Sequence, residues 1–111
     1  MDYLTIGRDA IERCLQKHAD IPFAQGEIDS EVIFDRENNH WVLFAIGWDG
    51  FKRIYAPLIH VEVKEGKFWV QHDGTEEGIA GDLVEAGVPK DQIVLAFQHK
   101  SRRKWGEFAP A

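Results

Sequence analysis

The chain has 111 residues, 44% of them hydrophobic and 12% aromatic, which suffices for one folded domain over residues 1–111 but not for two. No apolar run approaches the roughly 18 residues of a membrane-spanning helix, so no contact with a membrane is expected. The net charge of −6 disfavours a stand-alone nucleic-acid binder, because an acidic surface repels a phosphate backbone.

The first expected element is a helix that begins near residue 3. Asp2 precedes it as a capping residue, and its end frays from His18 onward because Pro22 cannot continue it. Its apolar side chains recur at three- and four-residue spacing and predict a buried stripe, formed by Tyr3, Ile6, Ala10, Cys14 and Leu15.

Four strands follow, over residues 27–35, 40–47, 51–64 and 67–72, joined by short turns. Residues 40–47 are apolar at both odd and even positions, which predicts a central strand covered on both faces. The Asp49-Gly50 pair is typical of a tight hairpin, and Pro57 predicts a bulge or bend in the third strand. These strands form an antiparallel meander.

The periodicity then returns to that of a helix. Asp73 or Thr75 is the expected cap, with Glu76 and Glu77 in the first turn and Gly87 at the end. A short strand over residues 93–97 comes next, followed by a basic segment expected to dock in part on the body. The fold class is therefore α+β: an antiparallel meander of about four to five strands, with an N-terminal helix and a second helix before a C-terminal strand.

The histidines are the first candidates for chemistry. His60 and Glu62 share one face of a strand, and His72 lies across the hairpin, so a metal site or a small enzyme site around these three residues is one hypothesis. The alternative is that they are polar side chains on the solvated face of the strand. This alternative is favoured, and neither a metal nor another cofactor is predicted.

Two further motifs have simpler structural interpretations. Cys14, the single cysteine, lies on the apolar stripe of the first helix, where a thiol behaves as a small hydrophobic group and not as a nucleophile. The absence of a disulfide pair is typical of a cytoplasmic protein. The glycines of residues 74–78 resemble a phosphate-binding turn, but Glu76 and Glu77 would repel a phosphate, so a helix cap is expected.

Candidate contact residues for a partner or for nucleic acid lie in two places. Trp48, in a tight turn, is a candidate anchor for a protein interface, and partial burial against the first helix is an equally favoured alternative. Residues 98–111 carry four basic side chains against one acidic side chain, and an aromatic ring accompanies them. This basic cluster, which favours weak, salt-sensitive contact with DNA, consists of Lys100, Arg102, Arg103, Lys104 and Trp105.

Several stretches, in this order, resemble the XisI family, the fdxN-element excision controlling factor proteins found chiefly in cyanobacteria. They are residues 21–28 (IPFAQGEI), 33–35 (IFD), 47–50 (GWDG), 59–64 (IHVEVK), 66–76 (GKFWVQHDGTE) and 83–97 (LVEAGVPKDQIVLAF). The resemblance covers nearly the whole chain. It implies a small α+β fold, a role in programmed DNA rearrangement beside a separate recombinase, and a nuclease-like companion of the XisH type. It implies no catalytic residues.

The leading hypothesis is therefore a non-catalytic accessory factor that acts through the XisH-type protein, with DNA contacted indirectly. The first alternative is direct DNA binding by the basic cluster, and the second is the site around His60, Glu62 and His72. A homodimer that buries Trp48 or Trp105 is a further expectation, because a small sheet with an exposed edge often pairs with a copy of itself.

Overall fold

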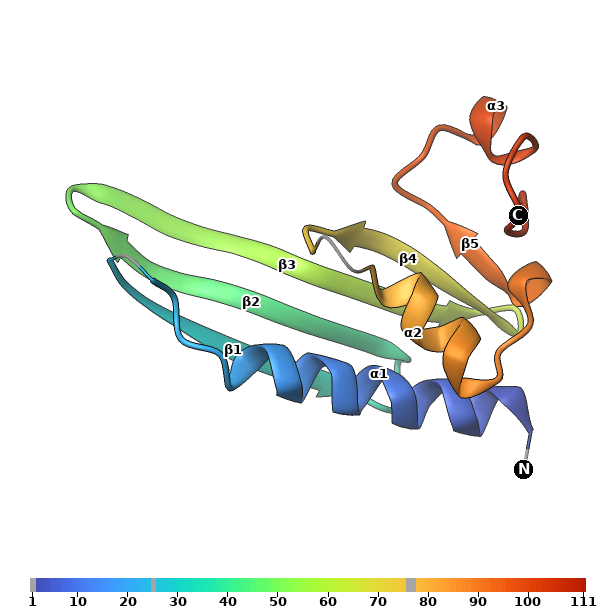
Figure 1. Cartoon of the computed structure of the whole chain (residues 1–111), viewed down its shortest axis with the longest axis horizontal. Helices are drawn as coiled ribbons and strands as arrows, with labels where there is room; N and C mark the ends of the chain where they lie inside the picture. The colour runs from blue at the N-terminus through green and yellow to red at the C-terminus, as the bar shows by residue number, and fades with distance from the viewer. Residues whose placement is uncertain (1, 25, 76–77) are drawn as a thin grey trace.

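The computed structural model describes residues 2–24, 26–75 and 78–111. The chain runs through a long helix, four strands, a second helix, a short fifth strand and a final helical turn (Figure 1). The elements are α1 (Tyr3–Ala19), β1 (Glu27–Asp35), β2 (His40–Asp49), β3 (Lys52–Lys64), β4 (Lys67–Asp73), α2 (Ile79–Ala86), the 3₁₀ turn η1 (Lys90–Gln92), β5 (Ile93–Leu95) and α3 (Lys100–Arg103). None of the described helices is long and apolar enough to cross a membrane.

Helix α1 begins as predicted and runs further than predicted. The Asp2 carboxylate accepts a hydrogen bond from the Thr5 backbone N–H at 2.8 Å, which confirms the cap. The helix continues through the segment expected to fray and ends at Ala19. Its buried face, which packs on the sheet, consists of Gly7, Ala10, Ile11, Cys14 and Leu15.

The five strands form one sheet in the order β1-β2-β3-β4-β5. The first four pair antiparallel, as predicted, whereas β5 lies parallel to β4, so the sheet is mixed. The register shifts between Leu43 and Phe44, beside Pro57, which confirms the predicted bulge, and again between His60 and Val61. The α+β fold class is confirmed.

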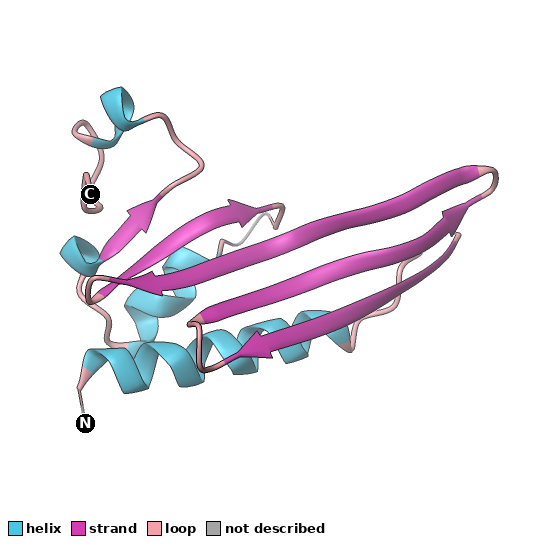
Figure 2. Ribbon diagram, turned by 180° about the vertical axis from the view of Figure 1, so that it is seen from behind, coloured by secondary structure: helices cyan, strands magenta, loops and turns pink. Residues whose placement is uncertain are grey.

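Helices α1 and α2 both lie on one face of the sheet (Figures 1 and 2). The side chains of this helix-covered face form the core, including the fully buried Trp41 and Phe68. Seen from behind, β1, β2 and β3 present their other face with no described helix over it (Figure 2). We call this second face, over β1–β3, the open face.

The predicted coverage of β2 on both sides is wrong. The strand does pair along both edges, and Trp41, Leu43 and Ala45 are buried under the helices. The alternate side chains, including Phe44 and Ile46, point to the open face and remain partly exposed because no second layer covers them within the described chain.

Helix α2 starts later than predicted, at Ile79. The residue at its N-cap is Gly78, so the predicted cap at Asp73 or Thr75 is wrong in position. The Asp73 carboxylate nevertheless accepts from the first helical N–H, that of Ile79, at 2.7 Å, and its other oxygen accepts from the Thr75 N–H at 2.9 Å. The predicted first-turn acids, Glu76 and Glu77, lie outside the described residues. Gly87 ends the helix with a left-handed φ of 117°, as expected for a C-terminal glycine.

The C-terminal segment docks along β5. The Ala109 N–H donates to the Ile93 carbonyl at 2.8 Å, and Phe108 packs against the core. Trp105, in contrast, is 82% exposed, so its ring takes no part in this docking. Strand β5 is two residues shorter than predicted, because the chain turns away after Leu95.

Candidate functional site

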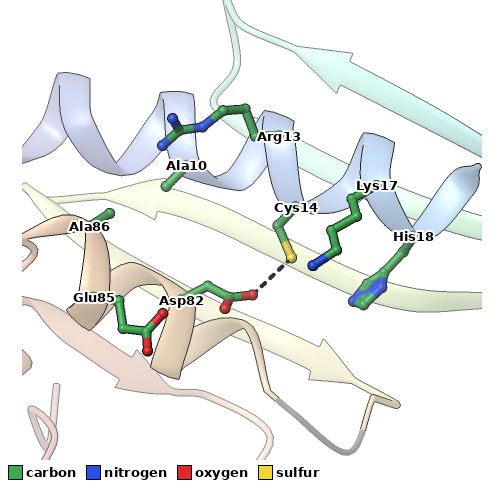
Figure 3. Close-up of a pocket in the computed structure, with 8 residues that line it drawn as sticks. All are labelled: Ala10, Arg13, Cys14, Lys17, His18, Asp82, Glu85 and Ala86. Atoms are coloured by element: carbon green, nitrogen blue, oxygen red, sulfur yellow. Dashed lines mark hydrogen bonds between the residues drawn. The ribbon is translucent and has the colours of Figure 1, made fainter.

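A groove of about 320 Å³ lies between α1 and α2 (Figure 3). Both helices rest on the same face of the sheet, so their facing side chains form its walls. The basic side chains come from α1 and the acidic ones from α2, which gives a groove of mixed charge. The lining residues are Ala10, Arg13, Cys14, Lys17, His18, Asp82, Glu85 and Ala86.

Cys14 is the only thiol in this groove, and its environment disfavours nucleophilic chemistry. Its Sγ–H donates to an Asp82 carboxylate oxygen at 3.1 Å (Figure 3). Burial, together with this hydrogen bond and the Asp82 charge, raises the pKa of the Cys14 thiol to about 12. The thiol is therefore protonated at neutral pH, in agreement with its interpretation as a small buried group.

A polar cluster occupies the open face where β2, β3 and β4 meet. His40 Nδ1 and His60 Nε2 lie 3.0 Å apart, and His40 Nε2 is 3.5 Å from a Glu62 carboxylate oxygen. Gln71 donates to the other Glu62 oxygen at 3.2 Å. Burial, followed by the neighbouring charge of His40, lowers the pKa of His60. Neutral His60 is thus favoured, which fits a hydrogen-bonded imidazole pair.

The predicted set of His60, Glu62 and His72 is only partly gathered. His72 is the register partner of His60, but the close contacts of Glu62 are with His40 and Gln71. Among the residues described, no group of three or more His, Cys, Asp or Glu side chains is arranged to hold a metal ion. His40 was missed because its pairing with Glu62 depends on the register of β2 and β3, which is interrupted by a bulge.

Trp48 belongs to an aromatic and cationic group on the open face, near the β2–β3 turn. The Arg53 guanidinium lies 5.3 Å from the Trp48 ring and 5.9 Å from the Tyr55 ring. The ring centroids of Phe44 and Tyr55 are 5.3 Å apart. Trp48 is 47% and Tyr55 65% exposed, so these rings remain available for contact with another molecule.

A second hollow lies at the C-terminal end of the chain, and two members of the basic cluster, Arg102 and Trp105, line it. This hollow has a volume of about 530 Å³ and is lined by Phe97, Gln98, His99, Arg102, Trp105 and Gly106. Lys100 and Arg102 lie on α3 and are exposed, and the Lys104 ammonium lies 5.3 Å from the Trp105 ring. Two exposed aromatic rings, Phe97 and Trp105, therefore accompany three exposed cations.

Arg103 differs from the other members of the basic cluster. Its guanidinium donates to the Gln98 carbonyl at 2.9 Å and to the Ala96 carbonyl at 3.1 Å, and it lies 5.9 Å from the Trp69 ring. These contacts hold the C-terminal segment against the sheet. Arg103 thus has a structural role in the fold.

The structure does not bring Trp48 and the basic cluster together. Trp48 is near the β2–β3 turn, whereas α3 lies at the opposite end of the molecule (Figure 1). The predicted contact residues therefore belong to two separate surfaces.

Comparison with known proteins places the whole chain beside one group. A family model described as XisI protein matches residues 1–110. A crystal structure of a XisI-like protein from Anabaena variabilis is 30% identical, with a TM-score of 0.88, and a crystal structure of fdxN element excision controlling factor XisI from the same species is 31% identical, with a TM-score of 0.85. Each match covers 99% of this chain and 100% of the other. No curated protein matches.

Proposed function

Because the chain belongs to the XisI family, we propose that it is a non-catalytic controlling factor for excision of a DNA element and acts through a nuclease-like, XisH-type protein partner. The observation that carries this proposal is the end-to-end similarity to a protein named fdxN element excision controlling factor. That similarity spans 99% of this chain and 100% of the other protein.

Charge supports a protein partner. Residues 1–97 contain nine basic and eighteen acidic side chains. A surface of this sign complements the positively charged surface by which a nuclease-like protein holds DNA, and such complementarity favours association and selects the partner. The protonated Cys14 thiol is consistent with a role that needs no nucleophile.

Co-expression with an XisH-type protein tests the proposal. Only the present chain would carry a tag, the captured material would be treated with nuclease, and light scattering would give the mass of the eluted species. We expect a stable complex that survives the nuclease. A chain that captures no such partner and instead retains DNA by itself would refute the proposal.

The exposed cations offer a matched control for this experiment. The triple variant Lys100→Ala, Arg102→Ala, Lys104→Ala should retain the protein complex, because the proposed contact uses the acidic body of the protein. Arg103 is left unchanged because its guanidinium holds the C-terminal segment.

The hollow at the C-terminal end favours direct DNA contact as a second candidate function. Phe97 and Trp105 can stack on unpaired bases, while Lys100, Arg102 and Lys104 can contact phosphates. This mode predicts binding of single-stranded DNA that weakens steeply with salt, with a shallower salt dependence in the triple variant. The double variant Arg13→Ala, Lys17→Ala, which removes exposed cations from α1, should bind like the wild type.

A further inference from the structure

We propose that the open face is a self-association surface, through which two copies of the chain stack sheet against sheet about a two-fold axis parallel to the strands. Apolar and aromatic side chains cross this face from β1 to β3. Ile33 is 51%, Trp48 47% and Tyr55 65% exposed, and Phe44 and Ile46 lie partly exposed between them. Such a patch is typical of an interaction site.

Near the β2–β3 turn, the charges on this face are sorted by strand. Glu27, Trp48 and Arg53 are consecutive partners across β1, β2 and β3. The next row on the same face pairs Asp29, Ile46 and Tyr55. Each of these two rows therefore runs from a carboxylate on β1, through an apolar side chain on β2, to a cationic or hydroxyl-bearing side chain on β3.

This order makes the part of the face near the β2–β3 turn complementary to itself in one orientation. A two-fold axis running along β2 places β1 of one copy over β3 of the other. Glu27 then faces the second copy's Arg53, Asp29 faces its Tyr55 hydroxyl, and the two Trp48 rings meet near the axis. A two-fold axis across the strands would instead stack β1 over β1 and bring the carboxylates together, which is unfavourable.

The dimensions of the face fit a modest homodimer. Three strands about 4.8 Å apart and about ten residues long give a face of roughly 14 Å by 33 Å. Because side chains make the face uneven, its accessible area is larger than this flat rectangle and moves toward the roughly 800 Å² that each partner buries in a standard interface. Aligned packing of two sheets is also a common arrangement. We therefore expect a dimer whose population depends on concentration in the micromolar range.

Sedimentation equilibrium of the full chain from about 5 to 500 μM tests this inference. The wild type should shift from monomer to dimer. Arg53→Glu and Glu27→Arg, each alone, should raise the dimer dissociation constant at least about tenfold, because each places like charges opposite one another across the interface. Circular dichroism and thermal melting would show that each variant is folded.

Mixing the two single variants gives the most specific readout. In the Glu27→Arg chain positions 27 and 53 are both positive, and in the Arg53→Glu chain both are negative. A mixed dimer of the two chains therefore brings opposite charges together at both contacts of the proposed interface. An equimolar mixture should recover dimers that neither variant forms alone. Recovery of this kind can only come from contacts between chains.

Lys52→Glu is the matched control. Lys52 immediately precedes Arg53 and is also exposed, but strand alternation directs it to the opposite face of the sheet. The same change of charge there should leave the dissociation constant within about twofold of the wild type. A protein that stays monomeric up to about 500 μM, a dimer that tolerates Arg53→Glu, or a mixture that fails to recover would overturn the inference.

Discussion

Gly7 lies where α1 approaches the sheet most closely, and Gly7→Ala is the substitution that tests this packing directly. A Cβ at position 7 would lie 2.7 and 2.9 Å from the Cε2 and Cε1 atoms of Phe68, and closer still to its Cζ. Phe68 is fully buried in the core, so its ring has no solvent into which it can move. Either α1 or the ring must shift.

The free-energy change has two parts of opposite sign. Replacing glycine by alanine inside a helix favours folding by about 0.5–1 kcal/mol, whereas adding a methyl group to a packed core disfavours it by about 1–3 kcal/mol. We expect a net destabilisation of about 1–2 kcal/mol, which lowers the melting temperature by about 5–10 °C for a domain of this size.

Gly81 provides the control, because it also lies within a helix but is exposed. A Cβ at this position would meet no other described atom within 4 Å. Gly81→Ala should therefore show the helix-propensity gain alone and stabilise the protein by about 0.5–1 kcal/mol. Urea unfolding of the wild type and both variants measures these differences. Equal stabilisation by the two substitutions would refute the packing of α1 on Phe68.

Three further predictions concern titratable groups. A hydrogen bond from the Arg36 guanidinium, and to a smaller extent one from the Trp41 indole, lowers the pKa of the Glu12 carboxyl below 4.5. Because this ion pair is exposed to solvent, Glu12→Gln should cost only about 0.5–1 kcal/mol in urea unfolding at pH 7. The cost should disappear as the pH falls below 4.5 and the wild-type carboxylate becomes protonated. Burial and the charge of His40 lower the pKa of His60 below the usual 6.5 of a histidine, so the free energy of unfolding should decrease as the pH drops below 6.5. The variant His60→Gln should flatten this pH profile between about pH 7.5 and 5.5. An unchanged profile would contradict the lowered pKa of His60. Because the pKa of the Cys14 thiol is raised to about 12, this thiol should react with a thiol reagent on the order of 1,000-fold more slowly in the folded protein than in the urea-unfolded protein at about pH 8. Comparable rates in the two states would show that the thiol is not buried.

Local signals were sufficient for most of the fold. Asp2 and Gly87 mark helix ends through hydrogen-bonding and backbone preferences that act within a few residues, so the sequence predicts both. The parallel pairing of β5 with β4, in contrast, could not be predicted from local signals. Its three apolar residues have no periodicity that distinguishes parallel from antiparallel pairing, and its place beside β4 follows from how α2 crosses the sheet.

The candidate site residues were harder to predict because their roles depend on distant contacts. Arg102 and Arg103 lie in the same basic stretch of the sequence, so nothing in the sequence distinguishes them. Only the tertiary structure shows that the Arg103 guanidinium donates to the Gln98 and Ala96 carbonyls. His40 contacts His60 because of the register between β2 and β3. A bulge shifts this register, so the contact cannot be predicted from the spacing of residues in the sequence. For Trp48 the sequence left two alternatives, an exposed anchor and partial burial against the first helix, and the ring is 47% exposed.

The incorrect prediction for β2 also supports the proposed dimer. Apolar side chains at both odd and even positions are typical of a strand with a packed layer on each face, yet the described chain covers only the side of Trp41, Leu43 and Ala45. Leaving Phe44 and Ile46 partly exposed forgoes the free energy of burying them, about 25 cal/mol for each Å². A second copy stacked on the open face would supply the missing layer. On this view the sequence pattern of β2 describes the strand in the assembled dimer, and loss of dimerisation in Arg53→Glu should be accompanied by increased binding of a hydrophobic dye to the newly exposed face.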